Sequence, residues 1–129
     1  MVNKEEILIE YLKELYPSIK IKAEYSTDDN DVDVIVVQEQ PGEKVVFFED
    51  TEPLFNYFQI NIYGTSIRQS KYISNQIGNL IGKHVKIKID KNTWQIIFMQ
   101  YSNPQPIEYL DIRRIGYTST MKCIINQIM

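Results

Sequence analysis

The chain has 129 residues and a mass of 15.2 kDa, which suffices for one hydrophobic core and is too short for two ordinary domains. Hydrophobic residues make up 43% and charged residues 24%, a globular composition that excludes a disordered chain. The single cysteine, Cys123, excludes an internal disulfide, and the single histidine, His84, excludes sites built from several histidines. A net charge of −3 argues against affinity gained by neutralising many phosphates.

The N-terminal segment predicts a helix near residues 4–15. Asn3 is suited to the N-cap, and Pro17 ends the segment. Acidic residues stand where a signal peptide needs basic ones, and no apolar run reaches the roughly 18 residues of a membrane span. We therefore expect a soluble protein that is not exported by the general route and does not enter a membrane. The apolar face of the helix comprises Ile7, Leu8, Tyr11, Leu12 and Leu15.

Three segments of the first half predict strands. Residues 19–25 alternate apolar and polar side chains, residues 32–37 are rich in valine and predict a strand inside the sheet, and residues 58–63 alternate again before stopping at Gly64. Residues 45–48 are apolar on both faces, which fits either a strand or a buried connector.

A second helix is predicted over 66–81. Ser66 is its N-cap, and Gly82 stands where a chain leaving a helix needs a left-handed residue. The predicted apolar face consists of Ile67, Ser70, Ile73, Ile77, Leu80 and Ile81.

The last third is predicted to be rich in strands. Strands over 85–89 and 94–101 flank a turn, residues 102–111 form an irregular proline-containing loop, and a final strand runs over 115–125. The expected fold class is α+β, with a mixed or antiparallel sheet of about five or six strands and both helices packed on it, in one domain spanning 1–129.

An acidic cluster at Asp28, Asp29, Asp31 and Asp33 invites comparison with a calcium loop. A loop opened at Asp29 would place valine where the turn needs glycine, and glutamine where a bidentate glutamate is needed. A solvated turn is the better interpretation, and neither a metal nor another cofactor is expected.

No catalytic group stands out. Cys123 alternates in phase with buried residues of the last predicted strand, which indicates an inert thiol, and His84 lies next to a predicted helix end. The basic stretch from Lys83 to Lys91 lacks the interleaved aromatic residues that stack nucleic-acid bases, so a solvated strand face explains it better. Phosphate loops, nucleophile elbows and framed carboxylate pairs are missing, and the sequence predicts no enzyme.

Two features favour contact with other proteins. Nine tyrosines and five phenylalanines exceed what a single small core needs, and aromatic residues are enriched at interfaces. Two of the three arginines lie side by side at Arg113 and Arg114, where arginine makes bidentate contacts that lysine does not. Surface arginines flanking a strand explain the second feature equally well.

From the strand Phe58–Tyr63, through Gly64 and the following helix, the pattern resembles the tail terminator family of tailed phages, whose members are often labelled minor capsid proteins. The resemblance extends to the N-terminal helix, the proline loop Pro104–Pro106 and the sequence 116–120. The chain departs from it in placing Tyr63 where a basic residue often precedes the glycine, and in a longer basic strand at 85–89.

The resemblance implies a structural protein of a virion or tail-like particle that forms a ring, expected to be a homohexamer. Such a ring caps the tail tube, ends its elongation, and contacts the tube protein and a neck or sheath protein, with DNA present only in transit. The candidate interface residues are Tyr63, Arg68, Arg113, Arg114 and Tyr117.

Two alternatives stay open. A head–tail connector or neck protein has a similar size and make-up, and a small soluble ligand-binding or regulatory domain would have the same composition.

Overall fold

The computed structural model describes residues 3–23, 34–40, 55–64, 66–107 and 115–128. The predicted Asp28–Asp33 turn, the segment 45–48, and Arg113 and Arg114 lie outside these residues. Along the chain the elements are α1 (Lys4–Leu15), β1 (Lys20–Lys22), β2 (Val34–Gln40), β3 (Asn56–Gly64), α2 (Ile67–Gly78), β4 (His84–Ile89), β5 (Asn92–Tyr101), β6 (Gln105–Pro106) and β7 (Ile115–Gln127).

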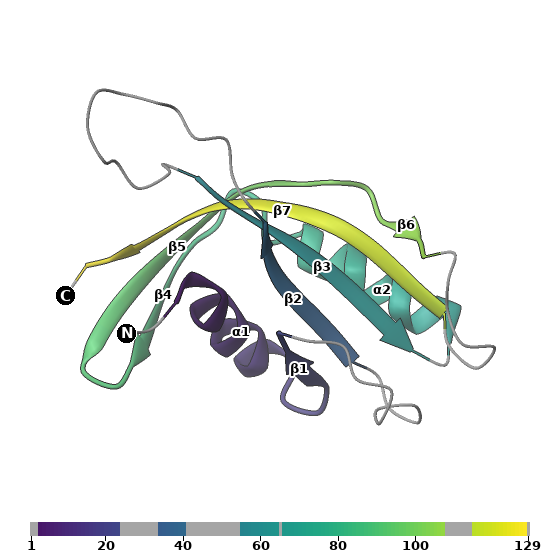
Figure 1. Ribbon diagram of the computed structural model, residues 1–129, viewed down its shortest axis with the longest axis horizontal. Coiled ribbons are helices and arrows are strands. Elements are labelled where there is room, and N and C mark those ends of the chain that lie inside the picture. Colours follow the sequence, from purple (N-terminus) through teal and green to yellow (C-terminus); the bar gives the residue numbers. More distant parts are fainter. Residues whose placement is uncertain (1–2, 24–33, 41–54, 65, 108–114, 129) are drawn as a thin grey trace.

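The strands form one curled sheet in the order β1-β2-β3-β7-β5-β4, with β6 added beside β7 (Figure 1). Strand β1 pairs in parallel with β2, and the other pairings are antiparallel. The longest ladder joins β3 to β7, and β7 pairs on its other side with β5, so strands distant in sequence make the centre of the sheet. The predicted α+β class is confirmed, and its sheet is mixed.

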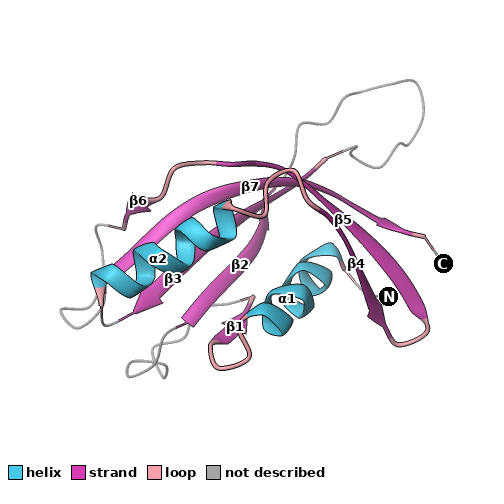
Figure 2. Cartoon of the chain, turned by 180° about the vertical axis from the view of Figure 1, so that it is seen from behind, coloured by secondary structure: helices cyan, strands magenta, loops and turns pink. Residues whose placement is uncertain are grey.

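Both helices lie on the same face of the sheet, which we call the inner face (Figure 2). Their apolar residues join one core with the inward side chains of β2, β3, β7, β5 and β4. This face follows from strand alternation, which buries every second side chain of β3 and β7. On the opposite, outer face, the buried apolar side chains among the described residues are Val34, Val36 and Tyr63, with Ile107 packed against them.

The N-terminal helix is confirmed at its expected place. The Asn3 side chain accepts a hydrogen bond from the backbone N–H of Glu6 at 2.8 Å, as the N-cap prediction requires. The prediction for its buried face was wrong at two positions: Leu15 is 42% exposed, whereas Ile9, which was left out, is buried. Leu15 is the last residue of the helix, and its side chain remains exposed there.

The second helix is shorter than predicted. It ends at Gly78, and the backbone N–H groups of Leu80 and Ile81 bond three residues back, which tightens the chain into turns. Ile81 is consequently exposed, contrary to the predicted apolar face. Gly82 does adopt the expected left-handed conformation, with φ of +88°.

Two details of the sheet differ from the sequence interpretation. Within the predicted loop, Gln105 and Pro106 form the short strand β6 beside Thr118 and Tyr117; Pro106 has no backbone N–H, which suits such a peripheral strand. Strand β5 shifts register between Phe98 and Gln100. This irregularity leaves Met99 exposed and places the next residue but one, Tyr101, opposite buried Met121.

Candidate functional site

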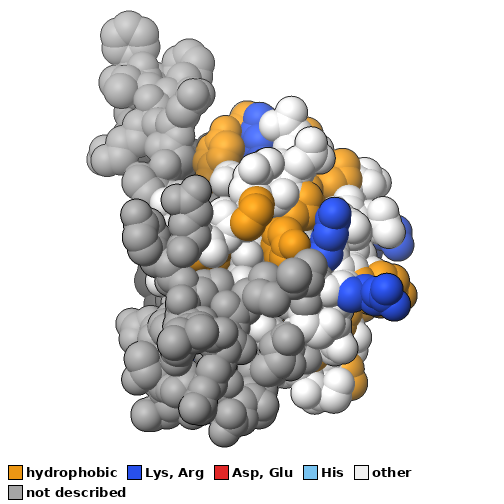
Figure 3. All heavy atoms as spheres, turned by 90° about the vertical axis from the view of Figure 1, so that its right-hand side faces the viewer, with side chains coloured by type: hydrophobic (Ala, Val, Ile, Leu, Met, Phe, Trp, Pro, Cys, Tyr) orange, Lys and Arg blue, Asp and Glu red, His pale blue; other side chains and the backbone are white. Residues whose placement is uncertain are grey.

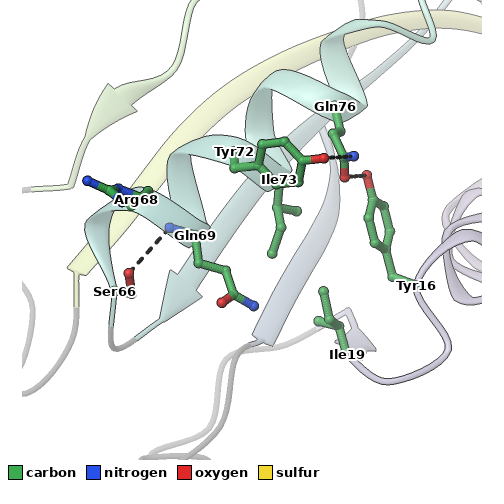
Figure 4. A pocket seen from close by; sticks show the side chains of 8 residues that line it. All are labelled: Tyr16, Ile19, Ser66, Arg68, Gln69, Tyr72, Ile73 and Gln76. Atoms are coloured by element: carbon green, nitrogen blue, oxygen red, sulfur yellow. Dashed lines mark hydrogen bonds between the residues drawn. The ribbon is translucent and has the colours of Figure 1, made fainter.

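An open groove of about 520 Å³ separates the outer side of α2 from the turn that follows α1 (Figure 4). The turn contributes Tyr16 and Ile19, and the first three turns of α2 with their cap contribute the remainder. The α2 residues that line the groove recur at helical spacing because one side of the helix faces the turn. They are Ser66, Arg68, Gln69, Tyr72, Ile73 and Gln76.

A chain of hydrogen bonds closes one end of this groove. The hydroxyl of Tyr16 donates to Oε1 of Gln76 at 3.2 Å, and Nε2 of Gln76 donates to the Tyr72 hydroxyl at 2.8 Å. Burial raises the pKa of Tyr16, and the neighbouring tyrosines raise it further. Tyr16 therefore remains a neutral hydrogen-bond donor at physiological pH.

The other end of the groove is basic. Arg68 stands exposed in the first turn of α2, where the Ser66 hydroxyl accepts the N–H of Gln69 at 3.4 Å. No acidic residue occupies this first turn. On the side of the molecule seen in Figure 3, the described side chains are apolar, neutral or basic, and none is acidic. The described part of this side, which includes Arg68, is suited to contact with an acidic group.

Beneath α2 lies a buried polar cluster. Ser74 and Tyr101 share a hydrogen bond of 2.8 Å between their hydroxyl groups, while Ser70 and Ser119 are buried beside the same helix and sheet. Burial raises the pKa of Tyr101, and the hydrogen bond with Ser74 partly opposes the rise. The cluster joins α2 to β5 through the Ser74–Tyr101 hydrogen bond.

Cys123 and His84 do not form a catalytic pair. Cys123 is fully buried on the inner face of β7, and burial raises its pKa to about 12. His84 is exposed on β4 and pairs with Ile97, which in turn pairs with Ile124, so His84 belongs to the outer face. The buried position predicted for Cys123 from the sequence is confirmed. His84 was expected next to the end of the second helix. Because α2 ends at Gly78, His84 is instead the first residue of β4.

Among the described candidate interface residues, the fold separates Tyr63 from Tyr117. Tyr63 is 8% exposed in the outer-face cluster, and its hydroxyl accepts from Nδ2 of Asn61 at 3.4 Å. Tyr117 pairs with inward-facing Ile62, which places it on the opposite face of the sheet. Arg68 lies on α2 at the groove. The fold therefore presents at least two separate surfaces, not one patch.

The helix-free outer face is the surface that sequence reasoning missed. Its central strands present amides and hydroxyls, including Gln59, whose Nε2 donates to the Thr118 hydroxyl at 3.2 Å. The ammonium group of Lys122 lies 4.1 Å from the centre of the Phe55 ring, a cation–π contact. In the sequence, Gln, Asn and Thr alternate with apolar residues along these strands. This alternation indicates a polar outer face only once the inward face of the sheet is known.

Metal binding and membrane insertion find no support in the described part of the chain. Among those residues, no group of three or more His, Cys, Asp or Glu side chains is placed to hold an ion. The helices there are too short and too polar to cross a bilayer.

Comparison with known proteins supports the fold. No family model and no curated protein matches this sequence. Among solved structures, a protein that carries only a sequence identifier as its name aligns over 97% of this chain and 92% of its own, with 11% identity and a TM-score of 0.57. At that identity the likeness concerns the arrangement of helices and strands alone.

Proposed function

We propose that this chain is the tail terminator of a phage or phage-tail-like particle, a ring that caps the tail tube and ends its growth. The observation that carries the proposal is the order of elements. The resemblance implies an N-terminal helix, strands, a strand ending at glycine, an amphipathic helix, and a β-region whose proline loop precedes the last strand. The described elements follow that order from α1 to β7.

A cap of this kind works by satisfying unpaired surfaces. The end of a growing tube exposes the contacts that the next tube subunit would make, and a ring that fits those contacts without reproducing them stops addition. Each ring subunit then needs one surface for the tube, one for the neck or sheath protein, and two for its neighbours. The groove with Arg68, the outer face of the central strands, the exposed side of α1 and the terminal strand β4 offer four surfaces in this chain.

The decisive experiment is electron microscopy of particles from a producer strain that lacks the gene. Tubes of uncontrolled length without attached heads are expected, because nothing would stop the addition of tube subunits. Tails of normal length beside filled but unattached heads would transfer the assignment to a neck protein. Unchanged particles would refute a structural role in the tail.

Complementation of that strain tests the groove end of the molecule. Arg68→Glu reverses an exposed charge at the basic end of the groove, and we expect it to restore normal tail length at least tenfold less efficiently than the wild type. Lys71→Glu makes the same change one turn along α2 on an exposed side chain that does not line the groove. Equal complementation by the two variants would remove Arg68 from the docking surface.

One observation favours a small ligand-binding domain as a second candidate. The groove volume of about 520 Å³ falls within the range of roughly 300–1,000 Å³ typical of ligand sites. Thermal unfolding of the full chain against a metabolite collection tests this candidate. A rise in Tm that Arg68→Ala abolishes would support ligand binding. An unchanged Tm with every compound would count against the ligand-binding candidate and leave the tail terminator as the remaining proposal.

A further inference from the structure

Charge is divided unequally along this chain. Residues 1–54 contain 14 acidic and five basic side chains, a net charge of −9, whereas residues 55–129 contain three acidic and nine basic ones, a net charge of +6. The total of −3 conceals this division. A chain with two oppositely charged parts can attract a second copy of itself in a head-to-tail manner.

The described acidic charge concentrates on one side of α1. Glu6, Glu10 and Glu14 are exposed and follow one another at intervals of four residues, so they form a stripe with a repeat of about 6 Å along the helix. We call these three residues the acidic stripe. Lys13 lies 3.4 Å from Glu10, an exposed pair of small energetic value. Like charges at this spacing weaken an isolated helix.

The described basic charge concentrates on β4, the last strand of the sheet path. His84, Lys86 and Lys88 are exposed at alternate positions, which gives a repeat of about 6.6 Å. We call these three residues the basic stripe; Lys86 and Lys88 supply its formal charge, since His84 is counted as neutral at pH 7. Within the described part of the chain, no carboxylate lies at ion-pair distance from Lys86 or Lys88. The two stripes are thus similar in length and repeat and opposite in charge.

The stripes cannot meet within one copy. Ile87, between the two lysines, points into the same core as Leu8 and Leu12 of α1, so Lys86 and Lys88 lie on the outer face while α1 covers the inner one. The sheet stands between them. Their complementary charges can be satisfied against each other only by two different copies.

We propose that the acidic stripe of one copy docks on the basic stripe of the next. The contact joins two different surfaces, so its repetition generates a closed ring or an open chain of subunits. It rests on the proposed function in one respect, since it would supply the contact between neighbouring subunits of the terminator ring. The lysines of a terminal strand can also serve only to prevent strand pairing, and the experiment separates these roles.

Sedimentation velocity of the full chain at about 0.02 M salt, where charges are weakly screened, measures the contact. The wild type is expected to self-associate at protein concentrations up to about 1 mM, and to dissociate at about 0.5 M salt. A wild type that stays monomeric at low salt over that range overturns the proposal.

Charge reversal identifies the surfaces. Lys86→Glu/Lys88→Glu and, separately, Glu6→Lys/Glu10→Lys each place like charges at the contact and should raise the dissociation constant at least tenfold. An equimolar mixture of the two variants, or one chain carrying all four changes, should regain association because opposite charges face each other again. Lys71→Glu, an exposed change on α2, should leave association unaltered. Unchanged association in the reversed variants, or no recovery in the mixture, refutes the docking and leaves the lysines as guards of the strand.

Cross-linking gives the geometry directly. A carbodiimide joins amines to carboxylates that are already in contact, and a mixture of light and nitrogen-15-labelled chains separates bonds between copies from those within one. Bonds from Lys86 or Lys88 to the acidic stripe are expected with both isotope forms in one product. Bonds from these lysines only to other carboxylates would overturn the assignment.

The two proposals fail in different experiments. Particles unchanged by loss of the gene would refute the terminator and leave the measured self-association standing. A Lys86→Glu/Lys88→Glu chain that restores normal tails would refute this contact and leave the terminator standing.

Discussion

At the scale of single residues, Gly82 holds the chain in a conformation that other residues resist. Its φ is +88°, an added Cβ would meet nothing within 4 Å, and its N–H donates to the carbonyl of Phe98 at 2.9 Å. Gly82→Ala therefore introduces backbone strain without a clash, and we expect it to lower the free energy of unfolding by about 1 kcal/mol.

Urea denaturation of the wild type and two variants measures that strain. Gly82→Asn should lose less stability than Gly82→Ala, because asparagine enters the left-handed region more readily. Equal losses in the two variants would mean that the hydrogen bond to Phe98, and not φ, controls this position.

Cys123 makes stability depend on alkaline pH. Burial raises its pKa from 9.0 to about 12, with Glu39 raising it and Lys4 lowering it to smaller extents. Below about pH 9 the thiol is protonated in both states. As pH rises from 9 toward 12 the unfolded chain releases this proton while the folded chain retains it, so stability falls.

The variant Cys123→Ala isolates this contribution. Tyr11, Tyr16 and Tyr101 also have raised pKa values and destabilise the fold in the same direction. The unfolding free energy of the variant, measured by urea titration between pH 8 and 10.5, should therefore decline less steeply than that of the wild type. Parallel curves would show that the thiol ionises as easily in the folded protein as in the unfolded one.

At the scale of elements, α2 packs closely on the sheet because its inner side is small. Ser70, Ser74 and Gly78 recur every four residues, and a Cβ at Gly78 would come within 3.0 Å of the Tyr101 ring. Because Ser74 holds that ring by its hydroxyl, we expect Gly78→Val to destabilise the protein by about 1–3 kcal/mol through overpacking.

A double-mutant cycle with Tyr101→Leu tests the cause. With the ring removed, Gly78→Val should cost at least about 1 kcal/mol less, because the two positions are in contact. Additive losses would show that contact with the ring is not the cause, and helix propensity could not explain them, because valine is a better helix former than glycine.

The sequence predicted those helices and strands whose structure depends mainly on residues within the same segment. Asn3, Ser66 and the alternation through Phe58–Ile62 place two helix starts and one strand without any knowledge of the remainder. The irregularity at Met99 and strand β6 depend on pairing with β7, which follows later in the chain, and the chain after α2 is held by the hydrogen bond from Gly82 to Phe98 of β5. No local pattern encodes such contacts. Ile81 and Leu15 are exposed because of where each helix ends, which the apolar spacing alone does not show.

At the scale of the whole molecule, the candidate surfaces also combine features that the sequence shows with features that only the fold shows. The unequal charge of the two halves can be counted from the sequence, and the alternation of Lys86 and Lys88 was visible there. Only the sheet order shows that β4 lies at an edge and that α1 covers the opposite face. The groove likewise joins Tyr16 to Gln76 across 60 positions, a separation that periodicity cannot bridge.

The sheet order also predicts which strands are the last to unfold locally. Strands β3 and β7 have partners on both sides, whereas β4 has one and β1 is only three residues long. Exposing the amides of β3 or β7 requires two ladders to separate, so we expect their hydrogen exchange to be at least tenfold slower than that of β4 and β1. Nuclear magnetic resonance of the monomer at high salt provides this measurement.

Repeating the exchange at low salt distinguishes two modes of association. Docking through side chains on the outer face leaves the free backbone edge of β4 in water, and its fast amides should stay fast while the chain associates. Addition of a neighbour's strand would bond those amides and slow them to the rates of β3. Since lysines oppose strand pairing at an edge, we expect the first result; slowing confined to β4 would replace charge docking by strand addition.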